Sequence, residues 1–179
     1  MVKVKSYANI AIVKYWGKKD AEKMIPATSS ISLTLNDMFT ETEMELIKDE
    51  DIKIAVEKEM KNGNCKDKFS NITDLFYLNG ELQDKVHTEK ISKVVDLSRE
   101  NRSQKVKIST TNNMPTAAGL SSSSSGLSAI IKACNKIFGK NYTQSELAQI
   151  SKFGSGSSSR SFFGPIAAWD KDTGEIYEV

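Results

Sequence analysis

The segment from Pro115 to Gly126 has the composition of a phosphate-binding loop. It reads Pro-Thr-Ala-Ala-Gly-Leu, followed by five consecutive serines and a glycine. Small residues let a backbone approach a ligand closely, and hydroxyls donate to oxyanions. The start of a helix adds unpaired N–H groups and a partial positive charge. The segment therefore predicts phosphate handling. Its alternative interpretation is a flexible serine-rich connection, or a helix N-cap with surplus serines.

Two further segments carry side chains suited to an anionic ligand. Residues 14–18 read Lys-Tyr-Trp-Gly-Lys, and residues 154–161 read Gly-Ser-Gly-Ser-Ser-Ser-Arg-Ser. Arg160 in the second could form two parallel hydrogen bonds to a carboxylate or phosphate. Taken singly, Tyr15 and Trp16 would also suit core aromatics. The glycines would suit a helix C-cap, and Arg160 a surface ion pair.

Other common catalytic arrangements are not indicated. No lysine follows the glycine of the serine loop as in a Walker sequence, and no Gly-x-Ser-x-Gly nucleophile turn is present. The only histidine, His87, lies in a polar, lysine-flanked stretch. We therefore expect His87 at the surface rather than in a serine hydrolase site.

Together, the three segments resemble the motifs of the mevalonate diphosphate decarboxylase branch of the GHMP kinase superfamily. Asn9–Lys18 is similar to N-I-A-x-x-K-Y-W-G-K. Pro115–Ser124 is similar to P-x-x-x-G-L-x-S-S-A/S, and Gly154–Ser161 to G-S-G-S-A-x-R-S. The motifs occur in the family's order and span nearly the whole chain.

The resemblance implies an activity in the mevalonate pathway of isoprenoid biosynthesis. This is the ATP-dependent decarboxylation of (R)-5-diphosphomevalonate to isopentenyl diphosphate, ADP, phosphate and CO2. ATP and Mg²⁺ would be the cofactors. Such a reaction needs a cradle for the nucleotide phosphates and cations for a second anionic ligand.

The resemblance also implies roles for individual residues. Lys18 would be the catalytic residue, close to the reacting end of the substrate. The substrate-binding residues would be Tyr15, Trp16, Gly17, Lys18, Lys90, Ser155, Gly156, Ser157, Ser158, Ser159 and Arg160. The nucleotide-binding residues would be Thr110, Asn113, Pro115, Gly119, Ser121, Ser122, Ser123 and Ser124. No residue is expected to be a metal ligand.

Members of that family continue into a C-terminal half, which supplies an essential aspartate. No residue within the matching motifs replaces that aspartate. We therefore expect residues 1–179 to form the N-terminal ATP- and substrate-binding domain, with the C-terminal domain absent from this chain and its activity incomplete. One alternative is another small-molecule kinase of the superfamily. The Tyr-Trp-Gly-Lys motif at residues 15–18 and the Gly-Ser-Gly-Ser motif at residues 154–157 argue against it. A non-catalytic phosphate- or nucleotide-binding fragment is the other.

Hydrophobic periodicity predicts the elements that position these segments. Helices are expected over 84–99, 127–138 and from the Thr143–Glu146 capping box to Gly154. Strands are expected over 2–6, 8–13, 30–35, 40–46, 76–81, 105–110 and 167–169. Residues 30–35 and 40–46 suggest an antiparallel pair. Residues 48–72 suggest a surface excursion with a short strand at 52–56.

The expected fold class is α+β, with the ribosomal protein S5 domain 2-like topology that the resemblance implies for the N-terminal domain. A mostly antiparallel sheet would carry helices packed on one face, and the serine loop would open the central helix.

Composition limits the location and the partners of the protein. The 179 residues are 39% hydrophobic and 27% charged, enough for a domain with a core. The net charge of +2 argues against a nucleic-acid surface. No apolar run approaches a membrane span, and Cys65 and Cys134 suit free thiols in a reducing compartment. We expect a cytoplasmic protein with a small-molecule substrate, no nucleic-acid or membrane partner, and a homodimer as one possible assembly.

Overall fold

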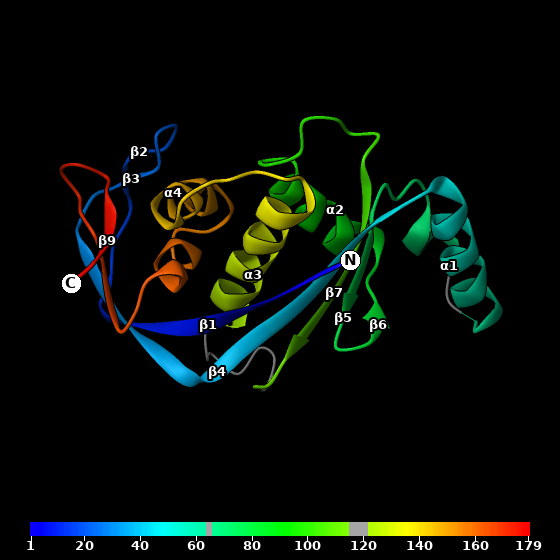
Figure 1. The fold of residues 1–179 in the computed structure, drawn as a ribbon, viewed down its shortest axis with the longest axis horizontal. Coiled ribbons are helices and arrows are strands. Elements are labelled where there is room, and N and C mark those ends of the chain that lie inside the picture. Colours follow the sequence, from blue (N-terminus) through cyan, green and yellow to red (C-terminus); the bar gives the residue numbers. More distant parts are fainter. Residues whose placement is uncertain (64–65, 115–121) are drawn as a thin grey trace.

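The computed structural model describes residues 1–63, 66–114 and 122–179. Its main sheet has seven strands in the order β6-β5-β7-β4-β8-β9, with β1 paired to β4 (Figure 1). These strands are β1 (Val2–Val13), β4 (Ser30–Ile47), β5 (Leu75–Leu78), β6 (Glu81–Leu82), β7 (Lys105–Asn112), β8 (Ile166–Trp169) and β9 (Ile176–Glu178). The pairing of β5 with β7 is parallel, and the other described pairs are antiparallel.

Three helices cover one face of this sheet: α2 (Lys85–Val95), α3 (Ser122–Ile137) and α4 (Gln144–Gly154). The core between helices and sheet includes Met44, Val106, Ile108, Ile131 and Trp169, all fully buried. The prediction of an α+β fold with a mostly antiparallel sheet is confirmed. The predicted helices at 84–99, 127–138 and after Thr143 are also confirmed.

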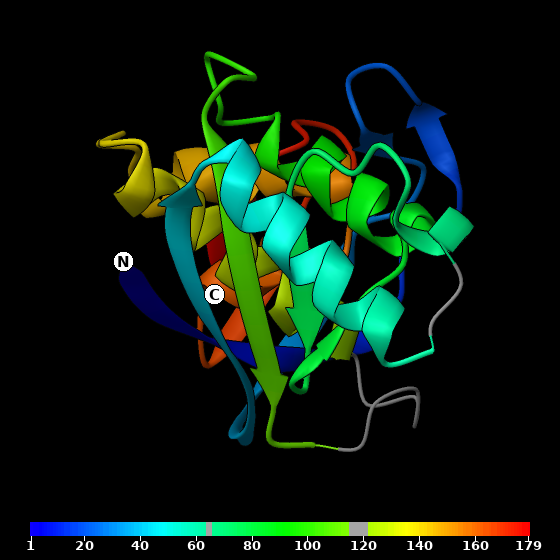
Figure 2. The ribbon, with the colours of Figure 1, turned by 90° about the vertical axis from the view of Figure 1, so that its right-hand side faces the viewer.

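The segment at 48–72 differs from its prediction. Helix α1 (Asp49–Lys61) replaces the expected strand at 52–56 and is followed by a short 3-10 helix, η1 (Lys66–Phe69). The Asp51 carboxylate accepts a hydrogen bond from the Lys48 backbone N–H at 2.8 Å and so starts the helix. Figure 2 shows α1 lying across the strands in front of the sheet. Ile52 packs there with Leu75, while neighbouring Phe76 faces the main core.

Strand β4 is one 18-residue strand, so the expectation of two strands forming an antiparallel pair was wrong. One edge of β4 pairs with β1. Its other edge pairs with β8 over residues 30–33 and with β7 over residues 40–47. Tyr7 pairs with Phe39 but Ala8 pairs with Leu35, so residues 36–38 bulge out of the strand. The interval between the two expected strands is therefore a bulge within one strand.

Two smaller features complete the scaffold. Strands β2 (Lys18–Asp20) and β3 (Ile25–Pro26) form a separate antiparallel pair, and η2 (Ser158–Phe162) follows α4 closely. His87 is exposed, as expected, and contacts the Asp84 carboxylate that caps α2. None of the helices in the described ranges has the length and apolar character needed to cross a membrane.

Candidate functional site

Arg160 is a buried cation held by neutral groups. It lies on η2 with 2% of its surface exposed. Its Nε donates to Ser32 Oγ at 3.1 Å, and its Nη1 donates to Ser30 Oγ at 2.9 Å. Among the described residues no carboxylate pairs with it, and burial lowers the pKa of Arg160. Because a guanidinium keeps its proton in proteins, the site holds an uncompensated positive charge.

Tyr15 and Gly156 are packed against each other beside this charge. The Tyr15 ring centroid lies 5.9 Å from the Arg160 Cζ atom and 5.0 Å from the Trp169 ring centroid. A Cβ built on Gly156 would stand 2.7 Å from the Tyr15 hydroxyl oxygen and 2.8 Å from Trp169 Cζ3. Position 156 therefore requires glycine, and residues 14–18 and 154–161 meet in space.

The serines of this segment divide into two groups. The hydroxyls of Ser158 and Ser159 are fully buried and donate to the backbone carbonyls of Ser155 and Gly156, at 2.7 and 2.8 Å. These hydrogen bonds lie within the turn and stabilise its backbone. Ser155 and Ser157 are half-buried, and their Oγ atoms lie 3.1 Å apart. These two hydroxyls are the ones on this turn that lie nearer to solvent.

Asn9, Ser30 and Ser32 complete the site, although no role was assigned to them from the sequence. The Asn9 side-chain amide donates to the Ser157 carbonyl oxygen at 3.0 Å and to Ser161 Oγ at 2.7 Å. Ser30 and Ser32 alternate with Ile31 on β4, and this alternation was the available signal. Two small polar residues on the inward face of a strand indicate a buried polar partner, here Arg160.

The three residues after Tyr15 do not pack in the cluster around Arg160. They are Trp16, Gly17 and Lys18, and they lead into β2. Trp16 is 72% exposed, and its backbone N–H donates to Thr28 Oγ1 at 2.8 Å. Gly17 has a φ of +66°, a left-handed conformation that glycine adopts without strain. Lys18 is exposed and begins β2. In the described part of the chain no contact joins Lys18 to Arg160.

Lys90 lies on α2 and is exposed. It precedes Val94 by four residues, so the two side chains share one helix face. A Cβ built on Gly154 would lie 3.4 Å from Val94 Cγ2. Lys90 is therefore one helical turn from the point where residues 154–161 begin, on the same face of α2.

The described residues predicted to bind nucleotide lie on β7, just after it, and at the start of α3. Pro115, Gly119 and Ser121 lie outside the described residues. Thr110 is buried on β7, with its Oγ1 3.0 Å from Thr42 Oγ1. The Asn113 side-chain amide donates to the Asp37 carbonyl oxygen at 2.7 Å and accepts from the Phe39 backbone N–H at 2.7 Å. Both side chains thus hold the strand that precedes the loop.

Ser122, Ser123 and Ser124 form the first turn of α3, which contains no acidic residue. Ser122 is half-buried, Ser123 is exposed and Ser124 is fully buried. Ser125 Oγ lies 2.7 Å from Thr40 Oγ1, and this contact fixes the helix start against β4. A helix start held in this way presents its N–H groups and partial positive charge to an anion.

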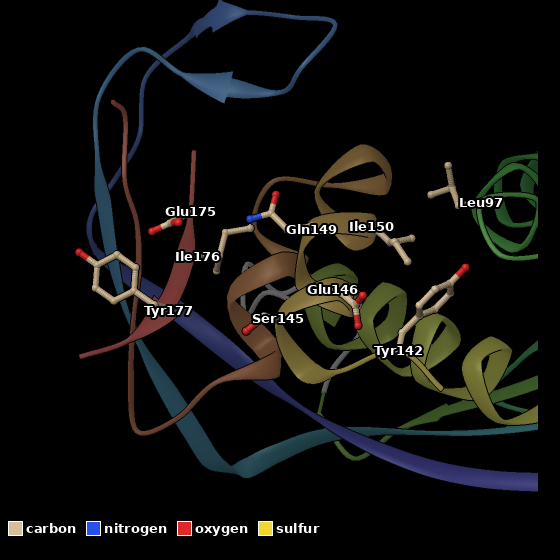
Figure 3. Close-up of a pocket in the computed structure, with 9 residues that line it drawn as sticks. All are labelled: Leu97, Tyr142, Ser145, Glu146, Gln149, Ile150, Glu175, Ile176 and Tyr177. Carbon is tan, nitrogen blue, oxygen red and sulfur yellow. The ribbon is translucent and has the colours of Figure 1, made fainter. Parts of the chain in front are cut away.

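A separate cavity of about 750 Å³ lies between α4 and β9 (Figure 3). Tyr142, Gln149, Ile150, Ile176 and Tyr177 are among its lining residues, and none of the residues predicted from the sequence borders it. Because none of the predicted site residues lines this cavity, we do not assign it to the candidate site despite its volume.

The fold and the site together define a domain of the GHMP kinase type. Its features are a sheet with three helices on one face, a serine-rich helix start, and a buried cation beside a glycine–serine turn. A family model described as the diphosphomevalonate decarboxylase-like N-terminal domain matches residues 6–176. The chain belongs to this family.

Known proteins agree with this assignment. The diphosphomevalonate decarboxylase of Schizosaccharomyces pombe is 33% identical over 188 residues, covering 97% of this chain and 42% of that protein. The solved mevalonate pyrophosphate decarboxylase of Streptococcus pyogenes has 53% identity and a TM-score of 0.79, covering 99% of this chain and 50% of that one.

A third relative was solved with ligands. The protein designated MDDEF, in complex with MVAPP, AMPPCP and magnesium, has 34% identity and a TM-score of 0.78, covering 99% of this chain and 50% of that one. The chain thus spans about half the length of the relatives it matches.

Proposed function

We propose that this chain is the N-terminal substrate- and ATP-binding domain of an ATP-dependent diphosphomevalonate decarboxylase. The whole protein would convert (R)-5-diphosphomevalonate and ATP to isopentenyl diphosphate, ADP, phosphate and CO2. The observation that carries this proposal is the buried Arg160 guanidinium, which has serine partners but no described carboxylate partner. The substrate would supply the missing negative charge.

The substrate carries a carboxylate and a diphosphate, and Arg160 would hold the former. Serines 30 and 32 occupy two of the donors of Arg160, and a guanidinium has five. The half-buried hydroxyls of Ser155 and Ser157 would donate to the same ligand. Ser158 and Ser159 would act indirectly, because their hydroxyls already bond to the turn itself. Gly156 would keep this turn close to Tyr15.

Lys18 and Lys90 would contribute the remaining positive charge on the substrate side. Lys90 would attract the diphosphate, because it lies one helical turn from Val94, which contacts Gly154. Lys18 would approach the reacting end, and Trp16 and Gly17 would line the approach to it. The exposure of Lys18 leaves its ammonium unpaired with any described carboxylate, so it can turn toward a bound anion.

The first turn of α3 would receive the ATP phosphates, with Ser122 and Ser123 as donors. The described residues contain no group of three His, Cys, Asp or Glu side chains able to hold a metal ion. Mg²⁺ would therefore be held chiefly by the nucleotide phosphates, with a serine hydroxyl as a compatible oxygen ligand. When bound, it would neutralise charge on the transferred phosphoryl group.

A cytoplasmic location and a homodimeric assembly are the finer parts of the same proposal. Burial raises the pKa of the Cys134 thiol to about 12, which keeps this thiol protonated and unreactive. Cys134 is a free cysteine, and free thiols are typical of a reducing compartment.

The decisive experiment is calorimetric titration of the chain with (R)-5-diphosphomevalonate. We expect Arg160→Ala to weaken binding about 100-fold or more, because it removes a charge-assisted, two-pronged contact. Arg102→Ala is the matched control, since the Arg102 side chain is 87% exposed. Equal binding by the Arg160→Ala variant, shown to be folded by circular dichroism, would refute the assignment.

Product analysis then separates the candidate activities. Coupled release of CO2 and phosphate identifies a decarboxylase, whereas a phosphorylated acid without CO2 identifies a kinase of the superfamily. We expect the 179-residue chain to bind the substrate without turnover, because the resemblance places the essential aspartate in the other half. Turnover by the chain alone would contradict the expectation that catalysis needs an aspartate from the other half.

A further inference from the structure

Lys132 is a second cation without a carboxylate partner in the described part of the chain. It lies in the C-terminal half of α3, near Ser161 and Phe162, the two residues that follow Arg160 on η2. Its Nζ donates to Ser6 Oγ on β1 at 3.2 Å and lies 5.2 Å from the centroid of the Phe162 ring. A hydroxyl and an aromatic ring are weak substitutes for a counter-ion, so this ammonium is poorly stabilised.

A cavity of about 430 Å³ borders the Lys132 side chain. Residues of four elements (β1, β4, α3 and η2) and of the turn after η2 meet around it. Asn36 belongs to the bulge of β4, Ser161 to η2, and Pro165 to the turn that follows η2. This volume lies within the range of small-molecule sites, and the lining includes the polar residues Asn36 and Ser161. A small reagent can therefore reach the amine from the cavity.

The surroundings of Lys132 favour its neutral form. Burial lowers its pKa to about 8, and the positive charge of Lys136, one turn further along α3, acts in the same direction. Tyr7, from β1, is the titratable side chain that shares the cavity lining. With a pKa near 8, about a quarter of the amine is unprotonated at pH 7.5, against about 0.1% for an ordinary lysine.

We propose that Lys132 is a modification site, acylated by small acyl phosphates that enter this cavity. The amine nitrogen attacks the acyl carbonyl carbon and forms the C–N bond. The bond between that carbon and the phosphate oxygen breaks, and inorganic phosphate leaves with the electron pair. The nitrogen loses its proton to solvent, and the product is a neutral amide. The Asn36 amide and the Ser161 hydroxyl border the cavity, where donors can contact the phosphate group.

The test is acetylation of the native chain by acetyl phosphate between pH 6.5 and pH 10.5, followed by peptide mass spectrometry. Lys136 is an internal control on the same helix, and it is exposed. At pH 7.5 we expect Lys132 to react at least tenfold faster than Lys136. Its rate should level off above about pH 8.5, while the Lys136 rate continues to rise. Equal rates, or faster reaction of Lys136, would overturn the proposal.

Two further measurements isolate the contribution of the fold. In 6 M guanidinium chloride, which unfolds the chain, the acetylation rates of Lys132 and Lys136 should differ by no more than about twofold. If Lys132 still reacted at least tenfold faster than Lys136 there, the fold would not be the cause of its reactivity. In the native chain the Lys132 rate should saturate with acetyl phosphate and fall when inorganic phosphate is added. A strictly linear dependence would overturn the role of the cavity. Neither result depends on the function proposed above.

Discussion

Gly156 lies so close to Tyr15 that a Cβ at position 156 would stand 2.7 Å from the tyrosine hydroxyl oxygen. Trp169 closes the position from a second direction, with its Cζ3 at 2.8 Å. Three segments distant in sequence therefore share one contact. The turn that precedes Arg160 is placed by this contact as well as by its own hydrogen bonds.

Gly156→Ala should destabilise the domain by about 1–3 kcal/mol, because a methyl group must displace two aromatic side chains. Chemical denaturation of the two proteins measures the difference. Combining Gly156→Ala with Tyr15→Phe should recover part of the lost stability. The second change removes the tyrosine hydroxyl oxygen, the nearest atom to the new methyl group, but leaves Trp169 in place. Gly126→Ala is the control: a Cβ there meets nothing within 4 Å, so stability should hold or rise. Equal effects at positions 156 and 126 would contradict the packing argument.

Arg160→Met should leave the free energy of unfolding within about 1 kcal/mol of the parent, or raise it, because the parent buries an unpaired charge. The same variant should lose the increase in melting temperature that (R)-5-diphosphomevalonate gives the parent. Thermal scans with and without the substrate measure both effects. A loss of several kcal/mol would instead mean that Ser30 and Ser32 compensate the buried guanidinium fully.

Asp74→Asn should cost about 3–5 kcal/mol of stability, because it breaks a buried ion pair. The Asp74 carboxylate accepts from Arg99 at 2.8 Å, from Ser92 Oγ at 2.6 Å and from the Val106 backbone N–H at 3.0 Å. One side chain thus ties the start of β5 to α2 and β7. Asp172→Asn, in an exposed turn, should change stability little. Urea unfolding of both variants distinguishes the two positions.

The stability of the chain should respond to Lys132 at alkaline pH. The folded-state pKa of about 8 lies below the ordinary value of 10.5. Between these two values the unfolded chain binds more protons, so the contribution of Lys132 to stability rises with pH in that window. Lys132→Met should remove this rise, and Lys136→Met should retain it. Urea unfolding at pH 7 and pH 10 gives the comparison, and identical slopes for parent and Lys132→Met would rule the effect out.

Lys90→Ala should weaken binding of the diphosphate substrate about tenfold, because it removes one cation from the face of α2 next to residues 154–161. Lys53→Ala provides a matched surface lysine on α1, which lies against the opposite face of β5. Calorimetry on the two variants decides the point. If both variants bind like the parent, Lys90 belongs to the solvated surface.

The sequence was sufficient to predict the helices and strands with strong periodicity, and the motifs that meet at Arg160. It was insufficient where the outcome depends on distant partners. Ile52 and Val56 fit both helical and strand spacing, and only packing against Leu75 decides for α1. The bulge at 36–38 needs β1 opposite it, and neither strand reveals this alone.

The same limitation applies to the site. Thr110 and Asn113 were predicted to bind nucleotide because they precede the serine loop, and no local pattern indicated the hydrogen bonds that their side chains make to β4. Ser30 and Ser32 looked like the polar face of an ordinary strand. Their partner Arg160 lies 130 residues beyond Ser30 in the chain, so no local pattern could assign it.

That separation also sets an order for folding on the ribosome. The pairing of β1 with β4 uses only residues up to 47, so it can form while most of the chain is still unmade. The hydroxyls of Ser30 and Ser32 must then stay solvated until η2 has emerged, and β8 closes the strand after that. The anion site is thus among the last parts of the domain to be assembled. A nascent chain that stalls before residue 160 would contain the paired strands β1 and β4 but lack the positive charge of Arg160.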